Sequence, residues 1–298
     1  MSTNPTDPRR QYPSTYFVDR SNEDEMARLT VQDRLVTAEM GGVLPEQPDP
    51  TNFRRMLDVG CGTGGWLIEA AKTYPTMTRL VGVDVNTRMI EYAREQAKIA
   101  QVHDRVDFQV MDALLILEFP KDYFDLTNLR LASSFMRTWN WPKMLDEMQR
   151  VTRPGGVIRL TELERVHSSS PALLRILDIA GEAFYRAGHL FSEGKTGDTS
   201  SQGTIGVASD LARLLHQYGV QDIQTHSSVL EFRAGTPAGQ SFAEDTRLAG
   251  RTVMPFVRKW GHLPDDYETL YQEMVREMQQ PDAMASSDVI TAWGIKAL

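Results

Sequence analysis

Residues 56–66, MLDVGCGTGGW, place four glycines directly after a short, mainly apolar run. A backbone this rich in glycine can turn tightly and let a ligand come close, because no side chain blocks the approach. Gly60, Gly62 and Gly65 also satisfy the spacing G-x-G-x-x-G of dinucleotide sites. A strand that runs into such a loop and then into a helix is typical of α/β folds, so this stretch restricts the architecture more than any other.

Strand-like and helical patterns alternate from residue 54 onward. Helical stretches such as WLIEAAKTY and TRMIEYAREQAKIA separate five buried strands, which read RMLDVG, LVGVDV, VDFQVMDA, FDLTNLRL and VIRLTEL. Two more strands are expected at IQTHSSVLEFR and DVITAWGIKAL. The pattern predicts an α/β fold with a Rossmann-like, mostly parallel sheet of seven strands and helices on both faces.

The composition limits the partners that the chain can have. Of its 298 residues, 41% are apolar and 24% charged, and the net charge of -8 offers no positive field for nucleic acid or an anionic membrane. The polar, proline-rich start does not resemble a signal peptide, and no apolar run reaches the roughly 18 residues of a membrane span. With Cys61 as the one cysteine, these features predict a cytoplasmic protein.

Asp58 argues against a phosphate in the glycine loop. At about 5 Å and an effective dielectric near 20, its carboxylate would repel a phosphate by about 3 kcal/mol per charge, and it would attract a cation by a similar amount. Two further acids follow strands: Asp84, 24 residues after Gly60, is placed to accept ribose hydroxyls, and Asp112 is placed to accept an adenine amino group. The ligand that suits this set is cationic and carries a nucleoside, as S-adenosylmethionine does.

These motifs resemble the class I S-adenosylmethionine-dependent methyltransferases. LDVGCGTGG, LVGVDVN, VDFQVMDA, FDLTNLRL and RPGGVIRLTE occur in the order of that family between residues 54 and 162. The resemblance implies that the last strand is antiparallel and that S-adenosyl-L-methionine is converted to S-adenosyl-L-homocysteine. It implies cofactor contacts from Asp58, Gly60, Cys61, Gly62 and Thr63 to the methionine, Asp84 and Val85 to the ribose, Asp112 and Ala113 to the adenine, and Asn128 or Leu129 below the sulfonium, with Met89 nearby. Tyr16 and Arg20 are expected to fold over the methionine end.

The same resemblance divides the chain. Residues 1–50 are expected as a helical N-terminal extension, and residues 51–161, 209–234 and 284–298 as the Rossmann-like core. Residues 162–208 and 235–283 leave the cofactor side of the sheet, so they predict a mostly helical cap that selects a small-molecule acceptor. Contacts to an apolar or aromatic acceptor are expected from Phe135, Tyr185, Phe256 and Trp260, and residues 192–203 have the composition of a lid.

Methyl transfer from a sulfonium needs a base only if the acceptor must lose a proton. His167 and His189 are the first candidates for that base, followed by Glu162 and Glu164, and positioning without a base stays an alternative. The six histidines lack metal-ligand spacing, so no metal is expected, and Cys61 reads as a packing residue.

Three other functions stay open. The chain could modify a protein or another macromolecule, it could be an NAD(P)-dependent oxidoreductase, or it could bind the cofactor as a regulator without transferring a methyl group. The sequence leaves open the acceptor, a role in secondary metabolism, transfer to oxygen, nitrogen or carbon, and the oligomeric state.

Overall fold

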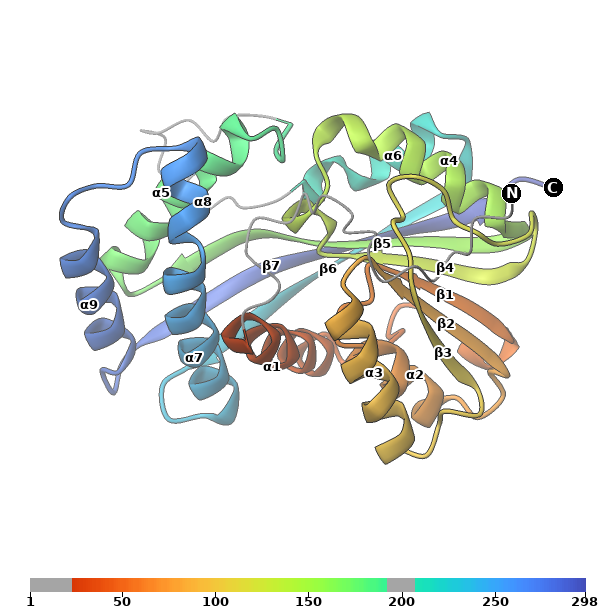
Figure 1. The fold of residues 1–298 in the computed structure, drawn as a ribbon, viewed down its shortest axis with the longest axis horizontal. Coiled ribbons are helices and arrows are strands. Elements are labelled where there is room, and N and C mark those ends of the chain that lie inside the picture. Colours follow the sequence, from red (N-terminus) through yellow and green to blue (C-terminus); the bar gives the residue numbers. More distant parts are fainter. Residues whose placement is uncertain (1–22, 192–206) are drawn as a thin grey trace, which may run out of the picture.

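A computed structural model of the chain describes residues 23–191 and 207–298 (Figure 1). One seven-stranded sheet runs through it in the order β3-β2-β1-β4-β5-β7-β6. The strands are β1 (Arg55–Val59), β2 (Arg79–Asp84), β3 (Val106–Val110), β4 (Phe124–Arg130), β5 (Thr152–Ser168), β6 (Val220–Arg233) and β7 (Met284–Lys296). The pairs from β3 to β5 are parallel, whereas β7 runs antiparallel to both β5 and β6. The predicted fold class, including the antiparallel last strand, is confirmed.

Helices cover both faces of this sheet. Nine α-helices are described: α1 (Glu23–Glu39), α2 (Gly65–Thr73), α3 (Thr87–Ile99), α4 (Trp141–Val151), α5 (Pro171–Arg186), α6 (Leu211–Gln217), α7 (Pro237–Thr252), α8 (Met254–Trp260) and α9 (Tyr267–Met278). In Figure 1, α4 and α6 lie over one face, α1, α2 and α3 lie over the other, and α5, α7, α8 and α9 gather at one end of the sheet. This end is the predicted cap.

The last three strands extend beyond the other four and form the floor of the cap. β5 continues to Ser168, which pairs with Ala285 on β7, and Arg233 at the end of β6 pairs with Met284. The expectation that the helical cap begins at residue 162 is therefore corrected. Residues 162–168 are strand, because β7 begins four residues earlier than expected and supplies their hydrogen-bond partners.

The N-terminal helix also joins the cap. α1 packs along α7 and reaches the start of α2. The buried side chains of Leu35 and Val36 on α1, and of Met40 directly after it, belong to the same apolar cluster as α5, α8 and α9. The described part of the expected N-terminal extension is thus a helix that forms one wall of the cap.

Gly64 allows the glycine loop to pack on the sheet. Its φ is +76°, and a Cβ placed there would lie 2.5 Å from Phe108 Cζ and 2.8 Å from the Ala93 Cβ. Gly62 has a similar φ of +53°, but a Cβ there would meet nothing within 4 Å.

This pair of glycines gives a matched test of packing against backbone strain. Gly64→Ala should lower the free energy of unfolding by about 3 kcal/mol, since a left-handed backbone and a clash add together. Gly62→Ala should cost about 1 kcal/mol, because it meets the backbone cost alone. Urea unfolding of both variants measures the difference, and equal losses would contradict the packing role of Gly64.

Candidate functional site

The glycine loop turns over the ends of β1 and β2. Gly60 has a φ of +69°, and a Cβ on it would lie 2.9 Å from Phe135 Cζ. The Cys61 N–H donates to the Val83 carbonyl at 2.9 Å, which holds the loop against β2. Glycine at position 60 is therefore required both by the backbone conformation and by the ring beside it.

A row of buried polar side chains crosses the sheet beneath this loop. Asp58, Asn128 and Arg159 occupy paired positions on β1, β4 and β5. Asn128 Nδ2 donates to Asp58 Oδ1 at 2.8 Å, and Arg159 Nη1 donates to Asn128 Oδ1 at 2.8 Å. Arg159 also pairs with Glu46 through Nε to Oε1 at 2.8 Å, with both side chains 1% exposed. The row therefore fixes the Asp58 carboxyl at the tip of β1.

The partners of Asp58 compensate only part of its burial. Burial raises the pKa of Asp58 to about 6, although Arg130 and the hydrogen bond from Asn128 act in the opposite direction, and Asp33 adds a like charge. For Glu46 burial also acts upward, but the Arg159 charge and hydrogen bonds outweigh it and lower its pKa. Asp58 is consequently an acid that would gain from a further positive charge.

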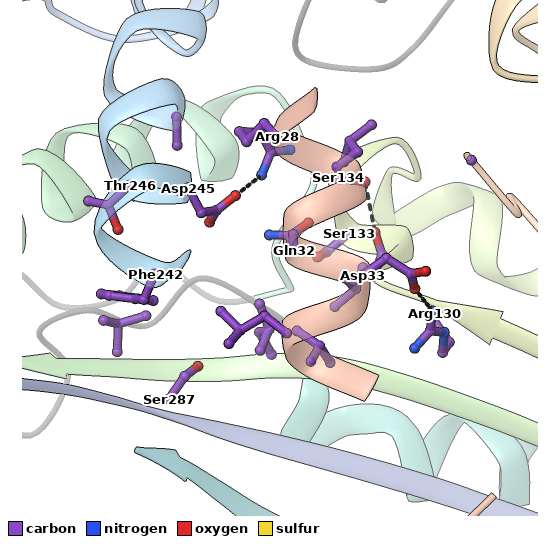
Figure 2. A pocket seen from close by; sticks show the side chains of 18 of the residues that line it. Arg28, Gln32, Asp33, Arg130, Ser133, Ser134, Phe242, Asp245, Thr246 and Ser287 are labelled. Atoms are coloured by element: carbon purple, nitrogen blue, oxygen red, sulfur yellow. Dashed lines mark hydrogen bonds and ion pairs between the residues drawn. The ribbon is translucent and has the colours of Figure 1, made fainter. Parts of the chain in front are cut away.

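Arg130 ties α1 to the carboxyl end of β4. Its Nη2 donates to Asp33 and its Nη1 to Thr37 Oγ1, and both acceptors lie on α1. Figure 2 shows the Arg130 guanidinium facing the Asp33 carboxylate. The side chains of Arg130 and Asp33 are only 12% and 18% exposed, so this ion pair holds α1 over the glycine loop from a partly desolvated position.

Asp84 lies at the end of β2, beside the same loop. Its Oδ2 accepts the Gly62 N–H at 3.1 Å, and its Oδ1 accepts the Asn86 N–H at 2.8 Å. Asp112 follows β3, where the Met111 N–H donates to the Asp84 carbonyl. The structure thus brings the two predicted nucleoside-binding acids next to each other.

A cavity of about 300 Å³ connects the glycine loop with the inside of the cap. Of the predicted cofactor residues it is lined by Asp58, Gly60, Cys61, Gly62, Thr63, Asp84 and Met89, together with the predicted acceptor contact Phe135. Its other end lies among apolar side chains, which include Leu173, Ile176, Leu177, Phe232, Phe242, Val253 and Met274. Val85, Asp112, Ala113 and Asn128 are not among the lining residues.

Glu162 on β5 is a third buried acid that lines the cavity, besides Asp58 and Asp84. Its Oε1 accepts the Ala132 N–H at 2.6 Å and the Ser133 N–H at 3.1 Å, and its Oε2 accepts the Ser133 hydroxyl at 2.8 Å. Burial nevertheless raises the pKa of Glu162 to about 7, against the effect of these donors. A carboxyl with this pKa can take up a proton near neutral pH.

A strained turn points those donors at Glu162. Leu131 has a left-handed φ of +54°, a conformation that costs a side-chain-bearing residue about 1–2 kcal/mol. The turn directs the N–H groups of Ala132 and Ser133 to the same carboxylate oxygen. Strain of this kind is commonly found where a site needs a fixed geometry.

The predicted histidines lie outside the cavity. His167 is on the outer part of β5, its side chain is 57% exposed, and its Nε2 lies 3.9 Å from Asp288 Oδ2. His189 is buried and its Nδ1 lies 2.7 Å from the Ser133 carbonyl, so it can orient Ser133. Burial lowers the pKa of His189. The structure therefore corrects the expectation that either imidazole meets an acceptor directly, since only Glu162 of the four proposed bases lines the cavity.

Most of the other residues that were expected to contact the acceptor or the sulfonium also lie outside the cavity lining. Phe256 packs on His189 and Phe184 behind the cavity wall. Neither Tyr185 nor Trp260 lines the cavity. Tyr185 is 37% exposed, and Trp260 lies beside Arg137. Leu129 packs in the core with α4 and α6, and residues 131 and 133–135 line the cavity beyond β4 instead.

Tyr16, Arg20 and the expected lid at 192–203 lie outside the described residues. Burial raises the pKa of the Cys61 thiol well above its usual value, in keeping with a packing residue. Within residues 23–191 and 207–298, no group of three or more potential ligands could hold a metal ion, and no helix is both long and apolar enough to cross a membrane.

Four functional residues escaped the sequence interpretation. Arg130 ends the strand FDLTNLR, and Arg159 stands between apolar residues in VIRL. A charge in a buried strand must find a partner, so the sequence carries this signal. Their partners Asp33 and Glu46 come from a helix and a proline-rich connection that are distant in sequence. Nothing in those segments indicated the pairing.

Comparisons with known proteins agree with the geometry. Residues 56–156 match the family model described as a methyltransferase domain. The 27-O-demethylrifamycin SV methyltransferase of Amycolatopsis mediterranei is 32% identical over 49% of this chain and 50% of its own length. Methyltransferase GfsG of Streptomyces halstedii is 31% identical over 50% of this chain and 49% of its own. The chain thus spans about half the length of the curated relatives it matches.

A solved structure extends the likeness of the fold to most of the chain. A candidate methyltransferase of Bacillus halodurans superposes with a TM-score of 0.52, covering 88% of this chain and 100% of that one at 15% identity. At this identity the superposition concerns the fold alone. Residues 56–156 thus match a methyltransferase domain, and the seven-stranded sheet that contains them has the Rossmann-like fold of methyltransferases.

Proposed function

We propose that this protein transfers the methyl group of S-adenosyl-L-methionine to an apolar small molecule. The observation that carries the proposal is one cavity that joins Asp58, Asp84 and the glycine loop to an apolar chamber inside the cap. The acid at the tip of β1 suits a cationic ligand, and Asp84 suits the hydroxyls of a ribose. Asp112 and Ala113, beyond β3, are proposed to hold the adenine.

Different residues are proposed to bind the donor, accept the proton and position the acceptor. S-adenosyl-L-methionine would supply a methyl group on a positively charged sulfur, which keeps the electron pair of the broken carbon–sulfur bond as S-adenosyl-L-homocysteine leaves. Asp58 would hold the ammonium end of the donor. Glu162 would accept the proton that an acceptor hydroxyl or acidic carbon loses, while Ser133 keeps its carboxyl in place. The apolar walls would position the acceptor and exclude water.

The cap supports a small molecule over a macromolecule as the acceptor. The chamber is enclosed by α1, α5, α7 and α9 above the floor of β5, β6 and β7. Its apolar lining offers few hydrogen bonds to a peptide or a nucleotide. The relative from Amycolatopsis mediterranei acts, by its name, on 27-O-demethylrifamycin SV, which makes that compound a reasonable first acceptor to test.

Ligand binding separates the proposal from a dinucleotide enzyme. Calorimetry should show binding of S-adenosylmethionine and S-adenosylhomocysteine, and none of NAD. Asp84→Ala should weaken both adenosyl ligands by about 10- to 100-fold, because charge-assisted hydrogen bonds to the ribose are lost. Asp107→Ala, which removes an acid of β3 that pairs with Arg79 at the surface, is the control and should leave both affinities unchanged. Tight binding of NAD alone would overturn the proposal.

Asp58→Asn should stabilise the free protein while it weakens the donor. The pKa of Asp58 is about 6 in the folded chain against an ordinary 3.8, so the folded state binds the proton more tightly and stability falls as pH rises between these values. At pH 7.5 the variant should therefore gain up to about 3 kcal/mol in urea unfolding, and at pH 3.5 the gain should vanish. Its affinity for S-adenosylmethionine should fall at pH 7.5. A variant that is no more stable at pH 7.5 would contradict the buried charge.

Glu162→Gln tests the base. In the wild-type enzyme, methylation of a hydroxyl acceptor should rise with pH around an apparent pKa of about 7, as Glu162 loses its proton. The variant should lose this dependence and about 100-fold or more in kcat, with its affinity for S-adenosylmethionine unchanged.

Glu164→Gln is the matched control. This carboxyl also has a pKa raised by burial, but it accepts the Ser209 N–H at 2.9 Å and does not line the cavity. Its kcat should stay close to that of the wild type. If Glu162→Gln also keeps its kcat within about threefold of the wild-type value, positioning alone suffices and the base is not needed.

A further inference from the structure

The cap half of the cavity contains one buried hydroxyl on its floor, that of Ser287. Ser287 lies on β7, is 2% exposed and lines the cavity. Its Oγ has no hydrogen-bond partner among the residues that the structure describes. In Figure 2 the side chain projects from the strands toward the space between α1 and α7. Because a buried hydroxyl without a hydrogen-bond partner destabilises the fold, Ser287 needs an explanation.

Its surroundings make a bound water a poor explanation. The residues paired with Ser287 across the sheet are Val166 on β5 and Leu230 on β6. Phe242 of α7, which stacks on Phe232 with ring centroids 4.3 Å apart, lines the same half of the cavity. A buried water needs two to four polar partners, whereas Val166, Leu230 and the two stacked rings offer no polar side chain. A ligand can instead bring one polar atom together with an apolar body.

The charges of the cavity indicate that the ligand is not an anion. Its lining carries five acids, and among the described residues two of them form ion pairs with arginines of the lining: Arg28 pairs with Asp245 at 3.1 Å, and Arg130 pairs with Asp33. The remaining acids are Asp58, Asp84 and Glu162. Both lining arginines are therefore already engaged by carboxylates, and a carboxylate or phosphate on the ligand would meet further negative charge.

We infer that the acceptor is a neutral, extended apolar molecule that carries a second oxygen, remote from the methylated atom, and that Ser287 donates a hydrogen bond to it. Thr246 of α7 and Gln32 of α1, which also line this half, are polar groups within the same chamber. Ser287 is then a specificity residue: it favours acceptors with a hydroxyl or carbonyl oxygen at that end. The inference rests on the proposed function only in treating the chamber as the acceptor site.

Matched eight-carbon probes test the inference without a known acceptor. Binding of 2-octanone and n-octane is measured by calorimetry on the full chain, for the wild type and for Ser287→Ala. The variant should bind 2-octanone about five- to tenfold more weakly, since one hydrogen bond is lost, and should bind n-octane within about twofold of the wild type. Equal effects on the two probes, or no binding of 2-octanone to the wild-type protein, would overturn the inference.

Two further variants control for folding and for position. Ser286→Ala removes a hydroxyl from the adjacent residue, which pairs with His167 and does not line the cavity, and it should change neither affinity. Ser287→Cys keeps the shape of the side chain, with a slightly larger terminal atom, but its thiol is a weak donor, so it should lose most of the preference for 2-octanone. If Ser287→Cys binds 2-octanone as the wild type does, the hydroxyl is not the recognition group.

Two other titrations test whether the acceptor is neutral and whether the role of Ser287 is independent of donor binding. Octanoate should bind more weakly than 2-octanone, and tighter binding of octanoate would contradict a neutral acceptor. Titration of the same variants with S-adenosylmethionine is a separate measurement, and Ser287→Ala should retain wild-type affinity. Failure of the wild type to bind that donor would overturn the proposed function, whereas the probe comparison would still decide the role of Ser287.

Discussion

The buried hydrogen-bonded row of Asp58, Asn128 and Arg159 is the interaction on which the site depends. Each member lies next to the following one on adjacent strands, and Glu46 closes the row at its far end. Removing two charges from water is expensive, and it is compensated only when every polar atom has a well-placed partner. The row therefore fixes the position of the Asp58 carboxyl and, with it, the register of the strands that carry the cofactor and acceptor sides of the cavity.

Much of the fold followed from local sequence signals. The five parallel strands were recognised from apolar runs bounded by turns, and the glycine loop could be placed because Gly60 and Gly62 need a left-handed backbone. Asp58 and Asp84 came together at the predicted edge, because the carboxyl ends of parallel strands meet there. The positions of these residues depend on contacts between neighbouring strands and helices. The alternation of strands and helices can be recognised directly in a sequence.

The features that the sequence did not predict depend on contacts between distant segments. Leu131 takes a left-handed φ without being glycine, so no residue type indicated the turn that serves Glu162. Phe256, which was expected at the acceptor, packs within the cap because the cap helices need a core of their own. Ser287 is a small polar residue within a strand. Only the apolar residues paired with it across the sheet make its buried hydroxyl unusual.

The continuity of β5, β6 and β7 has a mechanical consequence. The same hydrogen-bonded strands form part of the methyltransferase core and the whole floor of the chamber, so no flexible linker separates the two halves. A hinge that swings the cap away as a rigid body would have to break this ladder. Any opening of the cap would therefore be a movement of the helices above the floor. Among them, α1 is held by its buried side chains in the apolar cluster and by the ion pairs Arg28–Asp245 and Arg130–Asp33.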